Sequence, residues 1–338
     1  MANGIAEMLQ VTHKGGTDMR RFVWLMIVAF LAAASALATA QVFTTTRPPL
    51  GEKEWPVVKD GTTVKISPHV YVIPSESTPR VPNVGIIVGS KATMIVDPGM
   101  GLLSGQAVAR EMAKVSKNAE VYVVTTHLHP EHTTGEMAFP DAKIIRSAAQ
   151  DQDVREAGME WIGIFAKRSP ELAEILKGAS FRKPDEIYEK EKTVDLGGVR
   201  VRMIWVGPAH TFGDTVFFVE GDNVLFSGDL AMKNIFPAFA MPQSSMRNWL
   251  ASLDTLERLK ATHVVGSHGD HVADASIIRT NREILSAIQA RAAESKREGI
   301  PADVAGRKLA EELKAKYPAW DQPIRVWPAV AFAYKELP

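Results

Sequence analysis

The feature that most constrains the fold of this sequence is a cluster of histidines directly after a short apolar run. Residues 121–124 read Val-Tyr-Val-Val, without the alternation of a half-exposed strand, so we expect a strand buried on both faces. Residues 126–132 then read Thr-His-Leu-His-Pro-Glu-His. Imidazole and carboxylate are typical ligands of zinc, iron and manganese, so the pattern predicts a metal site at the end of this strand. A solvent-exposed turn is the alternative, and it is disfavoured because the chain has only nine histidines.

Two parts of the chain repeat the same order of elements. Each has two apolar runs joined by a glycine turn, then a segment with helical spacing, then another apolar run. The turn glycine and the acidic residue after the second run are equally spaced in both parts (Gly89 and Asp97, Gly221 and Asp229). We therefore expect an α/β fold in which two mixed β-sheets pack face to face between outer helices, an αββα sandwich. The expected strands are residues 63–66, 70–73, 84–88, 93–96, 121–124, 201–206, 216–219, 224–226 and 263–265. The expected helices are residues 103–115, 246–259, 277–290 and 302–316.

Three further motifs follow apolar runs of the second part. Residues 207–214 contain Gly-x-x-His-Thr-x-Gly-Asp, residues 227–229 read Ser-Gly-Asp, and residues 266–269 read Gly-Ser-His-Gly. Together with the cluster, which has the form His-x-His-x-Glu-His, they resemble in the same order the motifs of the metallo-β-lactamase superfamily. That family has Asp where this chain has Glu131. The resemblance spans residues 60–275 and implies the metallo-β-lactamase fold.

The resemblance also implies a centre with two metal ions. Carried over by motif position, the ligands are His127, His129 and His210 for the first metal, Glu131, His132 and His268 for the second, and Asp229 between them. Asp97 would orient ligand histidines, although it also suits a plain turn before Pro98. We expect two zinc ions per chain. A single metal ion, iron or manganese are the alternatives, because glutamate adds a methylene at position 131.

These ligands favour a metal-dependent, β-lactamase-like hydrolase. Zinc lowers the pKa of a bound water from about 15.7 toward about 7, and this hydroxide would open an ester, lactone or amide bond, β-lactams included. Glu131 and Asp229 are the candidate catalytic residues for proton delivery. Asp229 also resembles the bridging residue of glyoxalase-II-like hydrolases and lactonases, where true β-lactamases usually carry Cys or Ser. An iron-dependent redox or sulfur-metabolism enzyme and a non-enzymatic periplasmic metal-binding accessory protein are the alternatives.

Composition and the N-terminus limit the setting of this chemistry. The chain has no cysteine, which excludes disulfides, cysteine zinc sites and thiol nucleophiles. Its formal net charge is +0, so we expect no nucleic-acid partner. Residues 1–40 are typical of a signal peptide, with a basic start at Met19, a short apolar run and a small-residue site that predicts cleavage after Ala40. We therefore expect a periplasmic or secreted protein with no stable membrane span after cleavage.

The remaining residues divide into a lead-in, a catalytic domain and C-terminal helices. We expect an extended lead-in at residues 41–60, the catalytic domain at 61–275 with a helical insertion at 147–190, and helices at 276–338 that complete the same domain. The apolar loop at 232–241 predicts a wall for a small hydrophobic substrate, and Trp161 and Phe165 a lid. Simple packing of both against each other is the alternative. The sequence leaves the oligomeric state open.

Overall fold

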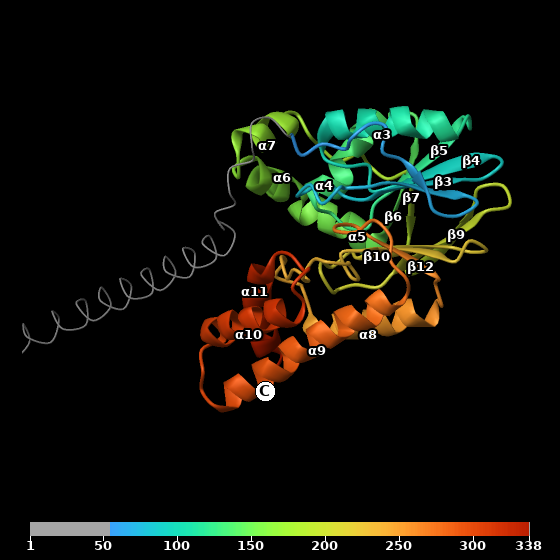
Figure 1. Cartoon of the computed structure of the whole chain (residues 1–338). Helices are drawn as coiled ribbons and strands as arrows, with labels where there is room; N and C mark the ends of the chain where they lie inside the picture. Colours follow the sequence, from blue (N-terminus) through green and yellow to red (C-terminus); the bar gives the residue numbers. More distant parts are fainter. Residues whose placement is uncertain (1–54, 338) are drawn as a thin grey trace, which may run out of the picture. The chain divides into compact units, whose positions relative to one another are not determined.

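The computed structural model describes residues 55–337, all of which belong to one compact unit (Figure 1). The predicted signal peptide at residues 1–40 and most of the predicted lead-in lie outside the described residues. Residues 55–60, at the end of that lead-in, form no helix or strand. Within the described range, no helix has both the length and the apolar character needed to cross a membrane.

The first sheet has seven strands in sequence order. The strands are β1 (Val64–Lys65), β2 (Val70–Ile73), β3 (Val84–Val88), β4 (Ala92–Val96), β5 (Glu120–Val124), β6 (Lys143–Ser147) and β7 (Glu186–Tyr188). Neighbours from β1 to β4 pair antiparallel, and β4 to β7 pair parallel. The sheet is therefore mixed, and the carboxyl ends of β4 and β5 lie at the same edge.

The second sheet has five strands in the order β12-β11-β10-β9-β8. They are β8 (Glu191–Asp195), β9 (Arg200–Trp205), β10 (Thr215–Val219), β11 (Val224–Gly228) and β12 (His263–Gly266). Neighbouring strands from β8 to β11 pair antiparallel, and β12 pairs parallel with β11. The parallel pair brings the carboxyl ends of β11 and β12 together, as β4 and β5 do in the first sheet.

The buried apolar side chains form three layers: one between the two sheets and one on the outer face of each sheet. Three layers arise because successive side chains along a strand point to opposite faces of the sheet. In β4, Met94 faces the second sheet while Ile95 faces helix α3 (Gly101–Val115). In β10, Phe217 faces the first sheet while Phe218 packs toward the C-terminal helices. Each buried side chain of this size contributes about 1.5–3 kcal/mol to folding. The arrangement confirms the predicted αββα sandwich, with α3 on one side and α8 and α9 on the other (Figure 1).

Helix α8 (Met246–Arg258) connects this core to the strand end that precedes Asp229. Ser245 caps the helix by accepting a hydrogen bond from Asn248 N, and the buried face of the helix carries Met246, Trp249, Leu253 and Leu256. The indole of Trp249 is fully buried and donates from Nε1 to the carbonyl of Leu230, at 3.0 Å. The loop that carries Asp229 is therefore held directly against the helix.

Several elements differ from the expected ones. Residues 147–190 contain the helices α5 (Ala148–Asp153), α6 (Met159–Ala166) and α7 (Pro170–Ile175) and the π-helix η2 (Val154–Gly158), but they also contain strand β7. Strands β6 and β8 were not predicted. At the C-terminus, α9 (Ser276–Arg297) extends beyond the expected residue 290, α10 (Ala302–Lys316) has the expected bounds, and the last apolar run is helix α11 (Val326–Glu336).

Candidate metal centre

The predicted ligands lie on loops that follow strands of both sheets. The histidine cluster follows β5, and Pro130 begins the short helix α4 (Pro130–Thr133), which carries Glu131 and His132. His210 lies between β9 and β10, and the other two ligands come directly after β11 and β12. All seven predicted ligands are buried, and they form three overlapping groups of potential metal ligands that share His127 and His132: His127, His129 and His210; His127, His132 and Asp229; Glu131, His132 and His268.

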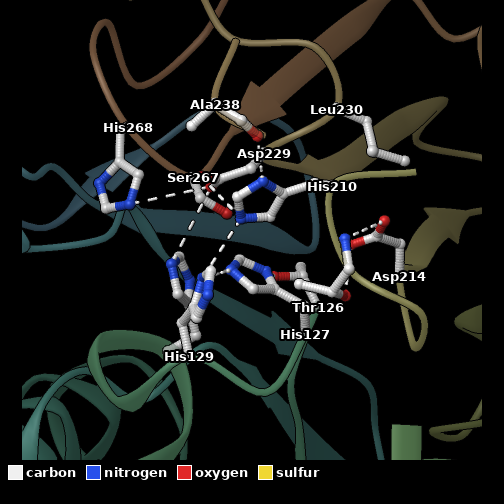
Figure 2. A network of polar contacts seen from close by, with 12 residues as sticks. Thr126, His127, His129, His210, Asp214, Asp229, Leu230, Ala238, Ser267 and His268 are labelled. Atoms are coloured by element: carbon white, nitrogen blue, oxygen red, sulfur yellow. Dashed lines mark hydrogen bonds and ion pairs between the residues drawn. The ribbon is translucent and has the colours of Figure 1, made fainter. Parts of the chain in front are cut away.

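The first three histidines point their ring nitrogens at one position (Figure 2). Nε2 of His127 lies 3.0 Å from Nδ1 of His129, and Nε2 of His210 lies 3.2 Å from the same atom. Two nitrogens bound to one tetrahedral zinc ion lie about 3.3 Å apart. The spacing of the three nitrogens therefore fits a single zinc ion.

Asp229, a member of the second group, lies close to ligand atoms of all three groups. Its Oδ2 is 3.6 Å from Nε2 of His210, and its Oδ1 is 4.0 Å from Nε2 of His132 and 3.8 Å from Nε2 of His268. The ligand atoms of Glu131, His132 and His268 lie within 4.8 Å of one another. Glutamate thus reaches the position where the resemblance implies a ligand, despite its extra methylene.

Hydrogen bonds behind the rings set which nitrogen faces the centre. His210 donates from Nδ1 to the carbonyl of Ala238 at 2.6 Å, and His268 donates from Nδ1 to the carbonyl of Val81 at 3.0 Å. A carbonyl can only accept, so each Nδ1 carries a proton and each Nε2 has a lone pair for a metal. These backbone contacts fix the two rings in the tautomer that a metal requires.

Asp97 orients two further histidines. Its Oδ2 accepts from Nδ1 of His132 at 3.0 Å and from Oγ1 of Thr126 at 2.9 Å, and the same threonine hydroxyl lies 3.0 Å from Nδ1 of His127. Asp97 also accepts from Thr126 N and from the hydroxyl of Ser267. The carboxylate is therefore saturated by groups from both sheets and faces the ligands from behind.

Several buried polar atoms of the centre have no hydrogen-bond partner. They include Nε2 of His132, Oε2 of Glu131 and Oδ1 of Asp229. A buried polar atom without a partner costs roughly 1–3 kcal/mol, so such a set needs a ligand. The donors are imidazole nitrogens and carboxylate oxygens, which suit zinc, iron or manganese. The residues present therefore fit metal ions at this centre.

The protonation of the centre also suits metal binding. Burial, reinforced by the neighbouring imidazoles, holds the pKa values of His127 and His129 well below the usual range, so both rings are neutral. For Asp229 burial acts to raise the pKa, but the surrounding histidines outweigh it and hold the carboxyl ionised. Burial opposes the charge on His132 as well, yet the Asp97 carboxylate raises the pKa of His132 to about 9. The ring of His132 therefore holds an additional proton, which a metal ion bound at this ring would displace.

A second carboxylate supports the loop of His210. Asp214, from the motif at 207–214, accepts from Thr211 N at 2.8 Å and from Ala209 N at 3.2 Å. In turn Asp153, at the end of α5, accepts from Gly213 N at 2.8 Å. Burial raises the pKa of Asp214 to about 6 and that of Asp153 to about 7. The helical insertion is therefore tied to a ligand loop through buried carboxyl groups.

Apolar side chains line one side of the centre. The ring of Trp161 lies 4.5 Å from that of His129, and the ring of Phe165 lies 6.2 Å away. Within the loop at 232–241, Phe236 and Phe239 pack into the core around α8, whereas Met241 joins Trp161 and Phe165 in one cluster. The loop therefore serves mainly as core, and its end and α6 together form the apolar side.

Three arginines outside the predicted site carry charges that act on Glu131. They are Arg80, Arg168 and Arg325. Each stands alone in the sequence outside every motif, so no local pattern marks it.

The sequence is similar to those of several curated proteins. One curated relative is the linear primary-alkylsulfatase of Pseudomonas sp., 23% identical over 264 residues that are 68% of this chain and 49% of the relative. The chain thus spans about half the length of that protein. An uncharacterised protein of Mycobacterium tuberculosis is 26% identical over 187 residues, 52% of this chain and 80% of its own.

Solved structures show the same fold. The stereoselective inverting sec-alkylsulfatase Pisa1 from Pseudomonas sp. matches 81% of this chain and 50% of its own, with a TM-score of 0.60 and 13% identity. A metallo-beta-lactamase family protein from Thermus thermophilus matches 80% of this chain and 94% of its own, with a TM-score of 0.56 and 19% identity. The family model of the metallo-beta-lactamase superfamily matches residues 77–268, more than half of the sequence. The motifs, the fold and this match agree, and the chain belongs to the metallo-beta-lactamase superfamily.

Proposed function

We propose that this protein is an exported metal-dependent hydrolase that opens an ester, lactone or amide bond of a small substrate. The observation that carries the proposal is the buried cluster of seven potential metal ligands that includes Asp229, in which several ligand atoms have no hydrogen-bond partner. Two zinc ions are the occupants that the donor set favours. Zinc bound there would lower the pKa of a water from about 15.7 toward about 7 and polarise the bond under attack.

The chain's own residues supply orientation and proton transfer. Asp97, Thr126 and the two backbone carbonyls hold the ligand rings with a lone pair toward the centre. Asp229 remains ionised and can accept a hydrogen bond from a water in the centre. The carboxylate of Glu131 is buried in the same cluster, so its oxygen that does not bind metal can take a proton from that water and return it to the leaving group. These two carboxylates are our candidate catalytic residues.

The substrate is proposed to carry an apolar part beside its reactive bond. Trp161, Phe165 and Met241 would contact this part, since they form one buried apolar cluster beside His129. Similar proteins are named alkylsulfatases and metallo-β-lactamases, so both ester-type and β-lactam substrates belong in a screen. Export rests on the predicted signal peptide, and its test is whether the N-terminus of protein from the periplasm begins at Gln41.

Metal content is the first measurement. Elemental analysis of purified protein should give about two zinc ions per chain. His127→Ala and His210→Ala should lower metal content and abolish hydrolysis of esters, lactones or β-lactams. His69→Ala is the control, because His69 is exposed and bonded to Asp222 away from the centre. Full metal content and wild-type rates in either ligand variant would remove the basis of the proposal. Tightly bound iron with oxygen-dependent turnover would instead favour the redox alternative.

A further inference from the structure

Three arginines from distant parts of the chain lie around the metal centre. Arg80 belongs to the loop between β2 and β3, Arg168 follows α6, and Arg325 ends the short helix η3 (Pro323–Arg325). All three side chains interact electrostatically with Glu131, and Arg325 also interacts with Asp229. Three separate segments thus bring positive charge to one place.

Contacts of the two later arginines fix this placement. The guanidinium of Arg168 stacks 4.0 Å from the ring centroid of Phe165, which faces His129. Arg325 donates from Nη1 to the carbonyl of Phe236 at 3.2 Å. Two residues after Phe236, the carbonyl of Ala238 accepts from the ring of His210.

Arg80 is placed by its neighbour in the sequence. It precedes Val81, whose carbonyl accepts from the ring of His268. Its backbone has a φ of 62°, a left-handed conformation that is unfavourable for residues other than glycine. The loop therefore holds the backbone of Arg80 in a conformation that arginine does not favour by itself, next to a contact with a ligand histidine.

The positive charges of these arginines are unfavourable in their buried surroundings. Each guanidinium repels at least one of the others, and burial disfavours the charge on all three. In the described part of the chain, Arg80 and Arg325 form no ion pair within 4.0 Å, whereas Arg146 is paired with Glu136 at 2.6 Å. The carboxylates that act on them, Glu131 and Asp229, also face the metal groups. When those carboxylates bind metal, less of their negative charge is available to Arg80 and Arg325.

We propose that Arg80, Arg168 and Arg325 bind the tetrahedral oxyanion of a sulfate or phosphate monoester, whose organic group lies against Trp161 and Phe165. This inference rests on the proposed function and narrows its ester class. Three planar guanidinium groups match the several oxygens of such an anion better than the two oxygens of a carboxylate. In the reaction water cleaves the ester, giving the alcohol, inorganic sulfate or phosphate and a proton where the charge state requires it. No redox partner is needed.

Anion binding is the readout that does not depend on turnover. Calorimetric titration of the zinc-loaded and the chelator-treated protein with inorganic sulfate, and separately with inorganic phosphate, should show saturable binding. Arg80→Gln and Arg325→Gln should each weaken it about tenfold or more, because each removes a charge-assisted hydrogen bond. Arg80→Lys should restore part of the affinity. Arg110→Gln is the matched control, since Arg110 pairs with Asp60 on the exposed face of α3.

Kinetic measurements then distinguish sulfate esters from phosphate esters as substrates, and the proposed hydrolysis from the proposed anion site. Hexyl sulfate and hexyl phosphate are the substrates, and the one that the centre accepts should show a KM raised more than kcat is lowered in Arg80→Gln. The inference would be overturned if Arg80→Gln and Arg325→Gln bound inorganic sulfate and inorganic phosphate as tightly as the wild type does. If the wild type hydrolyses neutral esters but binds neither anion, the hydrolase stands and the anion site fails. If anions bind through the arginines but no bond is cleaved, the proposed hydrolysis fails and the anion site stands.

Discussion

Oδ2 of Asp97 lies 3.0 Å from Nδ1 of His132, and both side chains are completely enclosed by the protein. The contact does more than hold one ring. Through Thr126 the same carboxylate reaches His127, so it connects ligands of all three groups. A change at Asp97 should therefore affect both metals without removing a ligand.

Asp97→Asn is the mildest test of this connection. Asp97 has a φ of 56°, and asparagine tolerates that left-handed conformation, so the backbone should stay in place. Losing the charge should lower the pKa of His132 and weaken metal binding about 10–100-fold. Competition with a chelator measures the affinity, and nuclear magnetic resonance of metal-free protein measures the pKa. Wild-type affinity in this variant would mean that Asp97 only shapes the turn.

Glu131→Asp tests the length of the unusual ligand. The substitution withdraws the carboxylate by about 1.5 Å, one carbon–carbon bond. Binding in the first group, which lacks Glu131, should persist, while binding with His132 and His268 should weaken and hydrolysis should slow. Elemental analysis after dialysis against a weak chelator should then find one metal where the wild type keeps two. Two equally tight metals in the variant would show that the extra methylene is not needed for binding.

Asp153 should make the stability of the fold depend on pH. Burial, with repulsion from Asp214, raises its pKa to about 7, although the bond from Gly213 N opposes this rise. The folded protein then holds a proton that the unfolded chain loses near the ordinary pKa of about 3.9. Stability from this group is complete below that value and is lost as the pH rises toward 7. Asp153→Asn should therefore gain stability over wild type by on the order of 2 kcal/mol more at pH 8 than at pH 5, measured by urea unfolding. An advantage that does not change with pH would contradict the assignment.

Two helical glycines form a matched pair for packing. A Cβ at Gly105 in α3 would overlap the carbonyl oxygen of Gly135, just after the histidine cluster, whereas a Cβ at Gly163 in α6 meets nothing within 4 Å. Gly105→Ala should lower the free energy of unfolding by about 1–3 kcal/mol through overpacking. Gly163→Ala should raise it by up to about 1 kcal/mol, because alanine favours helix. Thermal unfolding measures both, and a destabilised Gly163→Ala together with a neutral Gly105→Ala would contradict this packing.

Site residues that lie together in short motifs could be predicted from the sequence. The cluster at 126–132 and the motifs around His210, Asp229 and His268 each follow an apolar strand, and strand ends gather at one edge of a sheet. The same regularity predicted the two sheets and the helix α8. At these positions the local sequence pattern also indicates the place in the folded chain, because a loop that follows a buried strand lies at the edge of the sheet where the site forms.

Features that depend on distant partners could not be predicted. Strand β6 contains Arg146, which is buried against Glu136 and breaks the apolar pattern. Strand β8, at the edge of its sheet, has charged and largely exposed residues that look like a loop. Arg80, Arg168 and Arg325 meet only in the folded chain, so their relation to Glu131 has no sequence signal.

The two sheets contribute unequal and incomplete parts of the centre. His127, His129, Glu131 and His132 come from the first sheet, while His210, Asp229 and His268 come from the second. Each of the three ligand groups therefore draws on both halves of the sandwich. A nascent chain that has folded only its first half cannot complete any of these groups, so tight metal uptake has to wait until the second half docks. Tight metal binding thus requires the completely folded chain. A bound ion in turn stabilises the folded state, because the two halves cannot separate without losing it.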